Sequence, residues 1–126
     1  MENLRRIEPR PLTEREATWI RDILQVNEDW READISRTLV VAEELGKEGV
    51  SFVLQAPEPE NPKAKLKGES VGSLWINTDD GGTINVQLSQ FEGRLKEMYV
   101  LFVDAKNPKR GLPETWTEVS REAVNF

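Results

Sequence analysis

The residues of this chain that could do chemistry are carboxylates, lysines, hydroxyls and a single tyrosine, because the sequence contains neither histidine nor cysteine. Histidine is the side chain whose unperturbed pKa lies nearest neutral pH, and it is the commonest metal ligand. Cysteine would supply a thiolate nucleophile or a soft metal ligand. Their absence removes most routes to catalysis. We therefore expect no catalytic residue, no metal and no cofactor, and we predict that the protein is not an enzyme.

The remaining groups form no known catalytic pattern. The sequence lacks a G-x-x-x-x-G-K-[ST] phosphate loop, a G-x-G-x-x-G element and a G-x-S-x-G elbow. Asp79 and Asp80 precede two glycines, but the further oxygen ligands of a calcium loop do not follow. Glu43 and Glu44 are neighbours, so on a strand they would point to opposite faces and could not act as a catalytic pair.

Aromatic and basic residues are the better candidates for binding. Tryptophan dominates both core and interface energetics. We predict that Trp19 and Trp75 lie in the core or at its edge, whereas Trp30 and Trp116 have polar neighbours in the sequence and are more accessible to a partner. A ligand held between helix and sheet would use Trp75, Tyr99 and Arg94. The candidate partner-binding or ligand-binding residues are therefore Trp30, Trp75, Arg94, Tyr99 and Trp116.

Charge limits the class of partner. The chain has 23 acidic and 17 basic residues and a formal net charge of -6, which repels nucleic acid and anionic membranes. No stretch approaches the about 20 apolar residues that span a bilayer, and no apolar block follows the arginines of the first ten residues as in a secretory signal. We expect a cytoplasmic protein that binds another protein, with no nucleic acid and no membrane, as a monomer or a weak homodimer.

A single domain must position these residues, because 126 residues is a common size for one domain. Thr13 followed by Glu16 predicts a capping box at the start of a helix. Apolar residues then recur at helical spacing, which predicts a helix from about Thr13 to Val26. The first ten residues and the 57–69 loop, which carries prolines and alternating lysines, are expected to be mobile.

From Thr38 onward, β-branched and aromatic residues in short runs separated by glycine predict strands. Gly46 and Gly49 bound a hairpin connection, where we expect glycine to provide positive φ. Residues 34–45 also fit a helical stripe, so helix and strand both stay open there, although Val40 and Val41 favour a strand. The predicted strands are 38–45, 50–56, 71–78, 83–91 and 94–104.

These elements predict an α+β fold. An amino-terminal helix packs on an antiparallel, mostly meandering sheet of about five strands, and an irregular carboxyl-terminal segment closes the domain. The strand at 94–104 has apolar residues on both faces, so we place it in the middle of the sheet.

Several short motifs resemble those of a group of small bacterial α+β proteins of unassigned function. Members of that group often carry Cys-Gly-Cys where this chain has Leu45-Gly46-Lys47, so a metal or thiol role does not carry over. The resemblance implies the fold class and no activity. The motifs are the 12–16 helix start, Val40-Val41, 50–54, 86–88 with 93–95, and 112–116.

Two functional hypotheses follow. The first is a non-catalytic cytoplasmic interaction or accessory module, for example an immunity-type protein, that binds a protein through its acidic surface. The alternative is a small-molecule binder or atypical enzyme with a pocket between helix and sheet.

Overall fold

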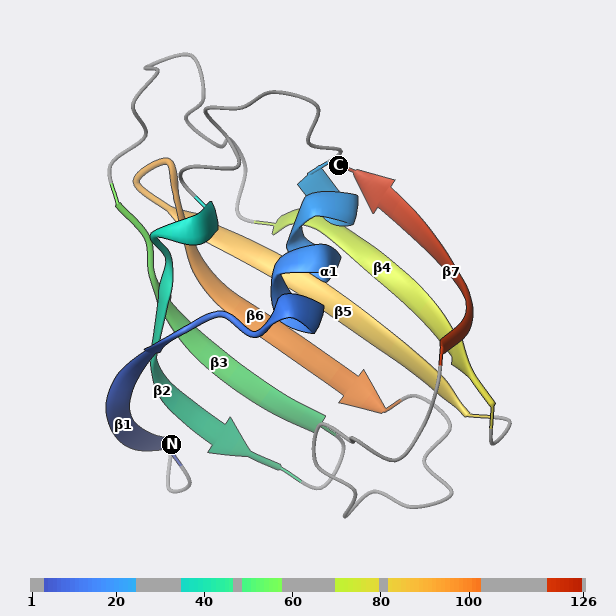
Figure 1. The fold of residues 1–126 in the computed structure, drawn as a ribbon, viewed down its shortest axis with the longest axis horizontal. Helices are drawn as coiled ribbons and strands as arrows, with labels where there is room; N and C mark the ends of the chain where they lie inside the picture. The colour runs from blue at the N-terminus through green and yellow to red at the C-terminus, as the bar shows by residue number, and fades with distance from the viewer. Residues whose placement is uncertain are drawn as a thin grey trace.

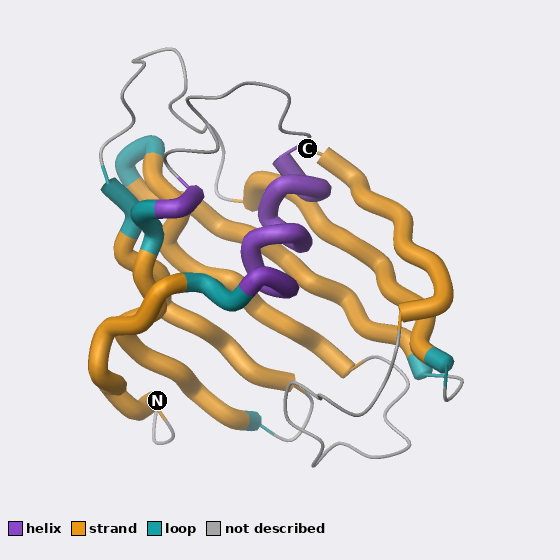
Figure 2. Tube along the Cα trace, viewed as in Figure 1, coloured by secondary structure: helices purple, strands orange, loops and turns teal. Residues whose placement is uncertain are grey.

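The computed structural model describes residues 4–24, 35–46, 49–57, 70–79, 82–102 and 118–125. Within these ranges, helix α1 (Glu14–Leu24) lies across one face of a seven-stranded antiparallel sheet (Figure 1, Figure 2). The strands are β1 (Leu4–Pro11), β2 (Leu39–Leu45), β3 (Gly49–Gln55), β4 (Ser70–Thr78), β5 (Thr83–Phe91), β6 (Arg94–Phe102) and β7 (Glu118–Asn125).

The strand order in the sheet is β1-β2-β3-β6-β5-β4-β7. The β2–β3 hairpin and the β4–β5–β6 meander meet where β3 pairs with β6. β1 adds to β2 at one edge, and β7 adds to β4 at the other. β6 is therefore the central strand, as its apolar residues on both faces predict, although residues 103 and 104 of the predicted strand lie outside the described residues.

The α+β class and the helix on an antiparallel sheet are confirmed, but the prediction of five strands is wrong. All five predicted strands are present, and β1 and β7 are added at the edges. The sequence pattern does not reveal β1 because six of its eight residues are charged or proline, which an edge strand tolerates and an interior strand does not. In β7, apolar and polar residues alternate too weakly for the sequence to distinguish the strand from a loop, because an edge strand needs few apolar residues. Residues 39–45 form strand β2, whereas residues 35 and 36 before it are helical and residue 37 lies in a turn.

The predicted capping box starts α1. The backbone N–H of Glu16 donates to Thr13 Oγ1 at 3.1 Å, and the backbone N–H of Thr13 donates to Glu16 Oε1 at 2.8 Å. The helix then buries Trp19, Ile20 and Ile23, all fully shielded from solvent. Each such side chain contributes about 1.5–3 kcal/mol of burial free energy.

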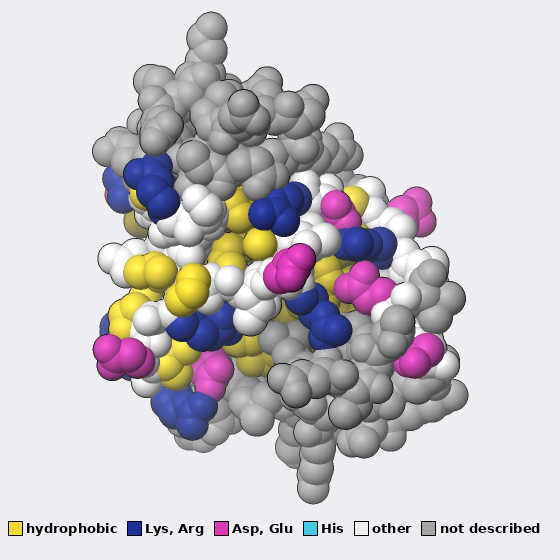
Figure 3. Space-filling model, viewed as in Figure 1, with side chains coloured by type: hydrophobic (Ala, Val, Ile, Leu, Met, Phe, Trp, Pro, Cys, Tyr) yellow, Lys and Arg dark blue, Asp and Glu magenta, His cyan; other side chains and the backbone are white. Residues whose placement is uncertain are grey.

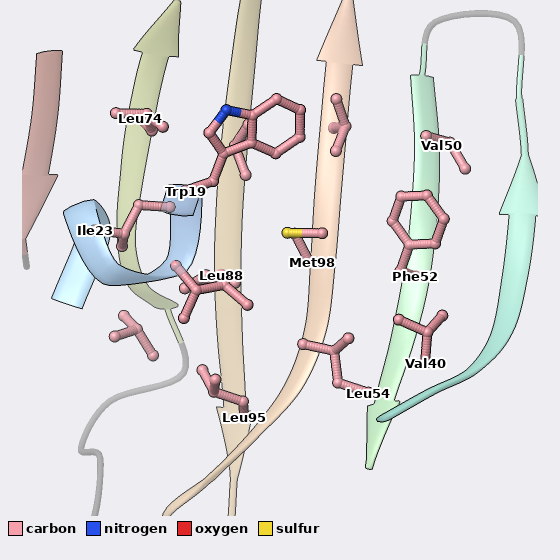
Figure 4. Packing of buried hydrophobic residues seen from close by; sticks show 14 of the residues in the cluster. Trp19, Ile23, Val40, Val50, Phe52, Leu54, Leu74, Leu88, Leu95 and Met98 are labelled. Atoms are coloured by element: carbon pink, nitrogen blue, oxygen red, sulfur yellow. The ribbon is translucent and has the colours of Figure 1, made fainter. Parts of the chain in front are cut away.

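The hydrophobic core lies between α1 and the sheet. α1 contacts β4, β5 and β7, and in Figure 4 the indole of Trp19 lies over β5. Buried side chains of β2, β3 and β6 extend the same core across the other half of the sheet. The strand residues labelled in Figure 4 are Val40, Val50, Phe52, Leu54, Leu74, Leu88, Leu95 and Met98.

Two turn glycines differ in their physical role. At the β5–β6 turn, Glu92 and Gly93 both have positive φ, 55° and 83°, as a type I′ hairpin turn requires. The predicted positive φ in the β2–β3 connection is wrong for Gly46 and Gly49, because neither lies in that region. Gly49 is required for a different reason: a Cβ there would collide with the carbonyl oxygen of Val100 on β6.

Candidate functional site

The strand register divides the sheet into two faces. Residues that are directly opposite on antiparallel neighbours share a face, and successive residues on one strand alternate between faces. Leu74 and Ile76 are fully buried on the α1 side, so Trp75 between them points to the opposite side. We call the side away from α1 the outer face.

A compact patch of polar and aromatic residues lies on the outer face across β7, β4, β5 and β6. One row runs from Glu122 through Trp75 and Asn85 to Leu101, and the next joins Ser73, Gln87 and Tyr99. Neighbouring strands lie about 4.8 Å apart, so the patch spans about 15 Å across the sheet. We call it the Trp75 patch; its members are Ser73, Trp75, Asn85, Gln87, Tyr99 and Glu122.

Trp75 is the prominent residue of this patch. Its side chain is 44% exposed, whereas Ser73 and Asn85 beside it are only 7% and 2% exposed. The large exposed apolar residues among those described are Leu4, Trp75 and Phe91. The register places all three on the outer face. Apolar exposure in the described part is therefore concentrated on the side of the sheet opposite the core.

Hydrogen bonds fix the amide groups around Trp75. Gln87 Nε2 donates to Asn85 Oδ1 at 2.7 Å, and Asn85 Nδ2 donates to the Leu74 carbonyl at 3.3 Å. On the other side, Asn77 Nδ2 donates to Ser120 Oγ at 3.0 Å, and Asn77 Oδ1 accepts from Thr83 Oγ1 at 3.3 Å. The surroundings of Trp75 are therefore preorganised, which reduces the entropy lost when a partner binds.

Several other polar groups of the patch have no partner in the part of the chain that the structure describes. Within the described ranges, the structure has no hydrogen bond from the Trp75 indole N–H, the Tyr99 hydroxyl or the Ser73 hydroxyl, and no ion pair to the Glu122 carboxylate. Ser73 is the most costly of these, because a buried hydroxyl without a hydrogen bond loses about 1–3 kcal/mol. Together they provide donors and acceptors that a bound molecule can satisfy.

The charge of the outer face is uneven. Among the described outward-facing side chains of β4, β5 and β7, none is basic, and Glu122 is acidic. Glu97 and Glu44 extend the acidic character over β6 and β2, on the same face as Tyr99. The part of the outer face that β4, β5 and β7 form is therefore suited to a cationic surface rather than an anionic one.

The helix side of the sheet carries ionisable groups that are paired with each other. Arg10 donates to both carboxylate oxygens of Glu16, at 2.8 and 3.0 Å, and its guanidinium lies 5.7 Å from the ring centroid of Phe52. Burial alone would raise the pKa of Glu16, but the hydrogen bonds from Arg10 and Thr13 outweigh it and hold that pKa below its usual value. The hydrogen bond to Glu16 in turn raises the pKa of Arg10 above its usual value.

A second network on this side joins α1 to β7. The indole N–H of Trp19 donates to Glu118 Oε1 at 2.7 Å. Arg121 bridges Glu118 at 3.4 Å and Asp22 at 2.7 Å. In Figure 3, viewed from the α1 side, basic and acidic side chains lie interspersed. We interpret these paired groups as structural.

The structure brings together only part of the predicted site. Trp75 and Tyr99 share the outer face, on β4 and β6. Arg94 lies at the β5–β6 turn opposite Phe91, five residues from Tyr99 and therefore about 16 Å along the strand. Trp30 and Trp116 lie outside the described residues.

Two expectations about these residues are wrong. Trp75 is not a core residue, because β4 turns it away from α1 and leaves it 44% exposed. Trp75 and Tyr99 also cannot line a pocket between helix and sheet, since both lie on the other face of the sheet.

The sequence reasoning missed several patch residues. The alternation of Ile84, Val86 and Leu88 with polar residues did indicate that Asn85 and Gln87 share one face. Nothing in the sequence connected them to Ser73. Glu122 was inaccessible to prediction because its strand, β7, was not predicted.

The described ranges contain neither a metal-binding cluster nor a membrane-spanning helix. No group of three or more acidic residues there is arranged to hold a metal ion. No described helix has the length and apolar character needed to cross a membrane. In comparisons with known proteins, no family model matches the chain, and no curated protein or solved structure shows significant similarity to it. Function must therefore be argued from the Trp75 patch itself.

Proposed function

We propose that this protein is a non-catalytic interaction module that binds another protein on the outer face of its sheet, with Trp75 as the anchor. The observation that carries the proposal is the 44% exposure of Trp75 among hydrogen-bonded amide side chains on the outer face, with no partner for its indole N–H among the described residues. Tryptophan is enriched among the residues that dominate binding energy, as is tyrosine, and both are present here with polar groups that no described residue pairs with.

The form of the surface favours a macromolecular partner. Small-molecule sites are concave and enclose most of the ligand, whereas the Trp75 patch is spread over four adjacent strands. A standard protein interface buries about 800 Å² on each partner, which a sheet face of seven strands can supply. The rigid amide network around Trp75 lowers the entropic cost of such docking.

The charge of the outer face indicates what kind of partner protein it binds. Glu122 and Glu44 lie on this face, and the whole chain carries a net charge of -6. A partner with a basic contact surface would be attracted and oriented by these charges. An acidic module that acts through binding alone suits an accessory or immunity-type role in the cytoplasm, and we include that role in the proposal.

Capture from lysate of the source cells tests the proposal when it compares matched variants. Wild-type protein, Trp75→Ala and Phe91→Ala are immobilised at equal density, and retained proteins are identified. Phe91 is the matched control, because it is 60% exposed on the same face but lies at the β5–β6 turn. We expect one basic protein to be retained by wild type and Phe91→Ala and lost from Trp75→Ala, and to bind again when purified. Equal retention by all three forms would reject the outer face as the binding surface.

A further inference from the structure

We propose that Trp75 and Glu122 form a receptor for a guanidinium group, so that an arginine side chain of the partner stacks on the indole and pairs with the carboxylate. This inference rests on the proposed function, and it names the chemistry that the outer face selects.

The two residues are placed for this task by the β4–β7 register. Trp75 is directly opposite Glu122, which puts their Cβ atoms about 5 Å apart on one face. Tryptophan is the aromatic residue that attracts cations most strongly. A planar cation on the indole ring is then within reach of the carboxylate, which supplies the opposite charge.

Among the described residues, two phenylalanine rings already have a cation, and Trp75 does not. Lys96 Nζ lies 5.2 Å from the ring centroid of Phe91, and the Arg10 guanidinium lies 5.7 Å from that of Phe52. Within the described ranges, Trp75 has no ring contact and Glu122 has no ion pair. An exposed indole and an exposed carboxylate thus lie side by side, and each lacks the cation that would complement it.

The neighbouring groups favour guanidinium over ammonium. Gln87 uses its amide nitrogen to donate to Asn85, which leaves its side-chain oxygen as an acceptor. Ser73 is 7% exposed, and its hydroxyl, which can accept, has no partner among the described residues. A guanidinium group has five donors in a plane and stacks on aromatic rings, so it can use a carboxylate and further acceptors together. An ammonium group is a point charge that is strongly hydrated.

Titration with small blocked peptides tests the receptor without the partner. The probe is acetyl-Gly-Arg-Gly-amide, and the comparison probes carry lysine or citrulline, the neutral isostere of arginine. Binding is followed by two-dimensional ¹H–¹⁵N NMR at low salt, through the Trp75 indole resonance, identified by its loss in Trp75→Leu, and the backbone amides of Asn85 and Glu122. We expect a saturable shift with the arginine peptide, a weaker response to lysine and none to citrulline.

The variants separate a specific receptor from general attraction to an acidic protein. Glu122→Gln should weaken arginine binding about two- to fivefold, as expected for one exposed ion pair. Glu97→Gln removes the same charge from the same face, three strands away from Glu122 and four residues from Leu101 of its row, and should leave the affinity unchanged. Trp75→Leu should abolish the shift of the Asn85 amide.

Two results would overturn the receptor. One is an equal response to arginine and citrulline, and the other is an equal effect of Glu122→Gln and Glu97→Gln. If either occurs while partner capture still depends on Trp75, the proposed function stands and the arginine receptor does not. If arginine binds as expected but capture is independent of Trp75, the receptor stands and the proposed partner surface fails.

Discussion

The buried pair of Arg10 and Glu16 gives the most quantitative prediction for stability. Glu16 is 2% exposed and accepts two hydrogen bonds from Arg10 and one from the backbone of Thr13. Glu16→Ala removes all three. It leaves the Arg10 guanidinium without its counter-ion and the Thr13 N–H without an acceptor.

The expected cost follows from those losses. Removing one member of a buried ion pair costs about 3–5 kcal/mol, and the Arg10 side chain is 33% exposed, so water reduces the penalty toward the lower end. We expect Glu16→Ala to lower the free energy of unfolding by about 3 kcal/mol. Glu16→Gln keeps an acceptor for Thr13, because a capping box tolerates glutamine, and we expect it to cost about 1–2 kcal/mol.

The pH dependence has a definite sign. The folded-state pKa of Glu16 is below its unfolded value, so its contribution is present above the unfolded pKa of about 4.3 and is lost as the pH falls through the folded pKa. Urea unfolding of wild type and Glu16→Gln, followed by circular dichroism from pH 7 to pH 3, measures the difference. The stability advantage of the wild type should shrink as the pH decreases.

Two results would refute this account of the pair. The first is a cost below about 1 kcal/mol for Glu16→Ala at pH 7. The second is strict additivity of Glu16→Gln and Arg10→Met in a double-mutant cycle, because residues that interact directly must show a coupling energy.

Three further predictions concern the scaffold, each checked by thermal or urea unfolding. Gly49→Ala should destabilise the protein by more than about 1 kcal/mol, because the added Cβ collides with the Val100 carbonyl; an unchanged stability would contradict the close approach. Glu92→Asn should raise the melting temperature by about 4 °C, since asparagine tolerates the positive φ at lower cost; a decrease would show that the turn differs. Trp19→Phe should cost about 2 kcal/mol, because it removes the bond to Glu118 and some buried area; a loss no larger than that of Glu118→Gln would indicate that packing contributes little.

The predictable part of the fold is the part with strong local chemistry. Thr13 and Glu16 predict the start of the helix, and the alternation of Ile84, Val86 and Leu88 with polar residues predicts a strand with one polar face. β1 and β7 were not predictable in the same way. Edge strands need few apolar residues, and Arg5 pairs with Glu43 and Arg121 with Asp22 only once the chain has folded.

The candidate site was predictable only in part for a related reason. Trp75 and Tyr99 were recognised by residue type, but the face on which each lies depends on strand register, which one residue of shift reverses. Glu122 entered the site through the pairing of β7 with β4. Such a pairing joins segments that are distant in the sequence, and local patterns do not encode it.

Calorimetric titration of the purified partner against wild type, Trp75→Ala and Phe91→Ala tests the central claim most directly. We predict that Trp75→Ala weakens binding about 30-fold, equivalent to about 2 kcal/mol, while its circular dichroism spectrum stays that of the folded wild type, because Trp75 lies outside the hydrophobic core. Phe91→Ala should bind as the wild type does. Equal affinity of wild type and Trp75→Ala would contradict the outer-face account.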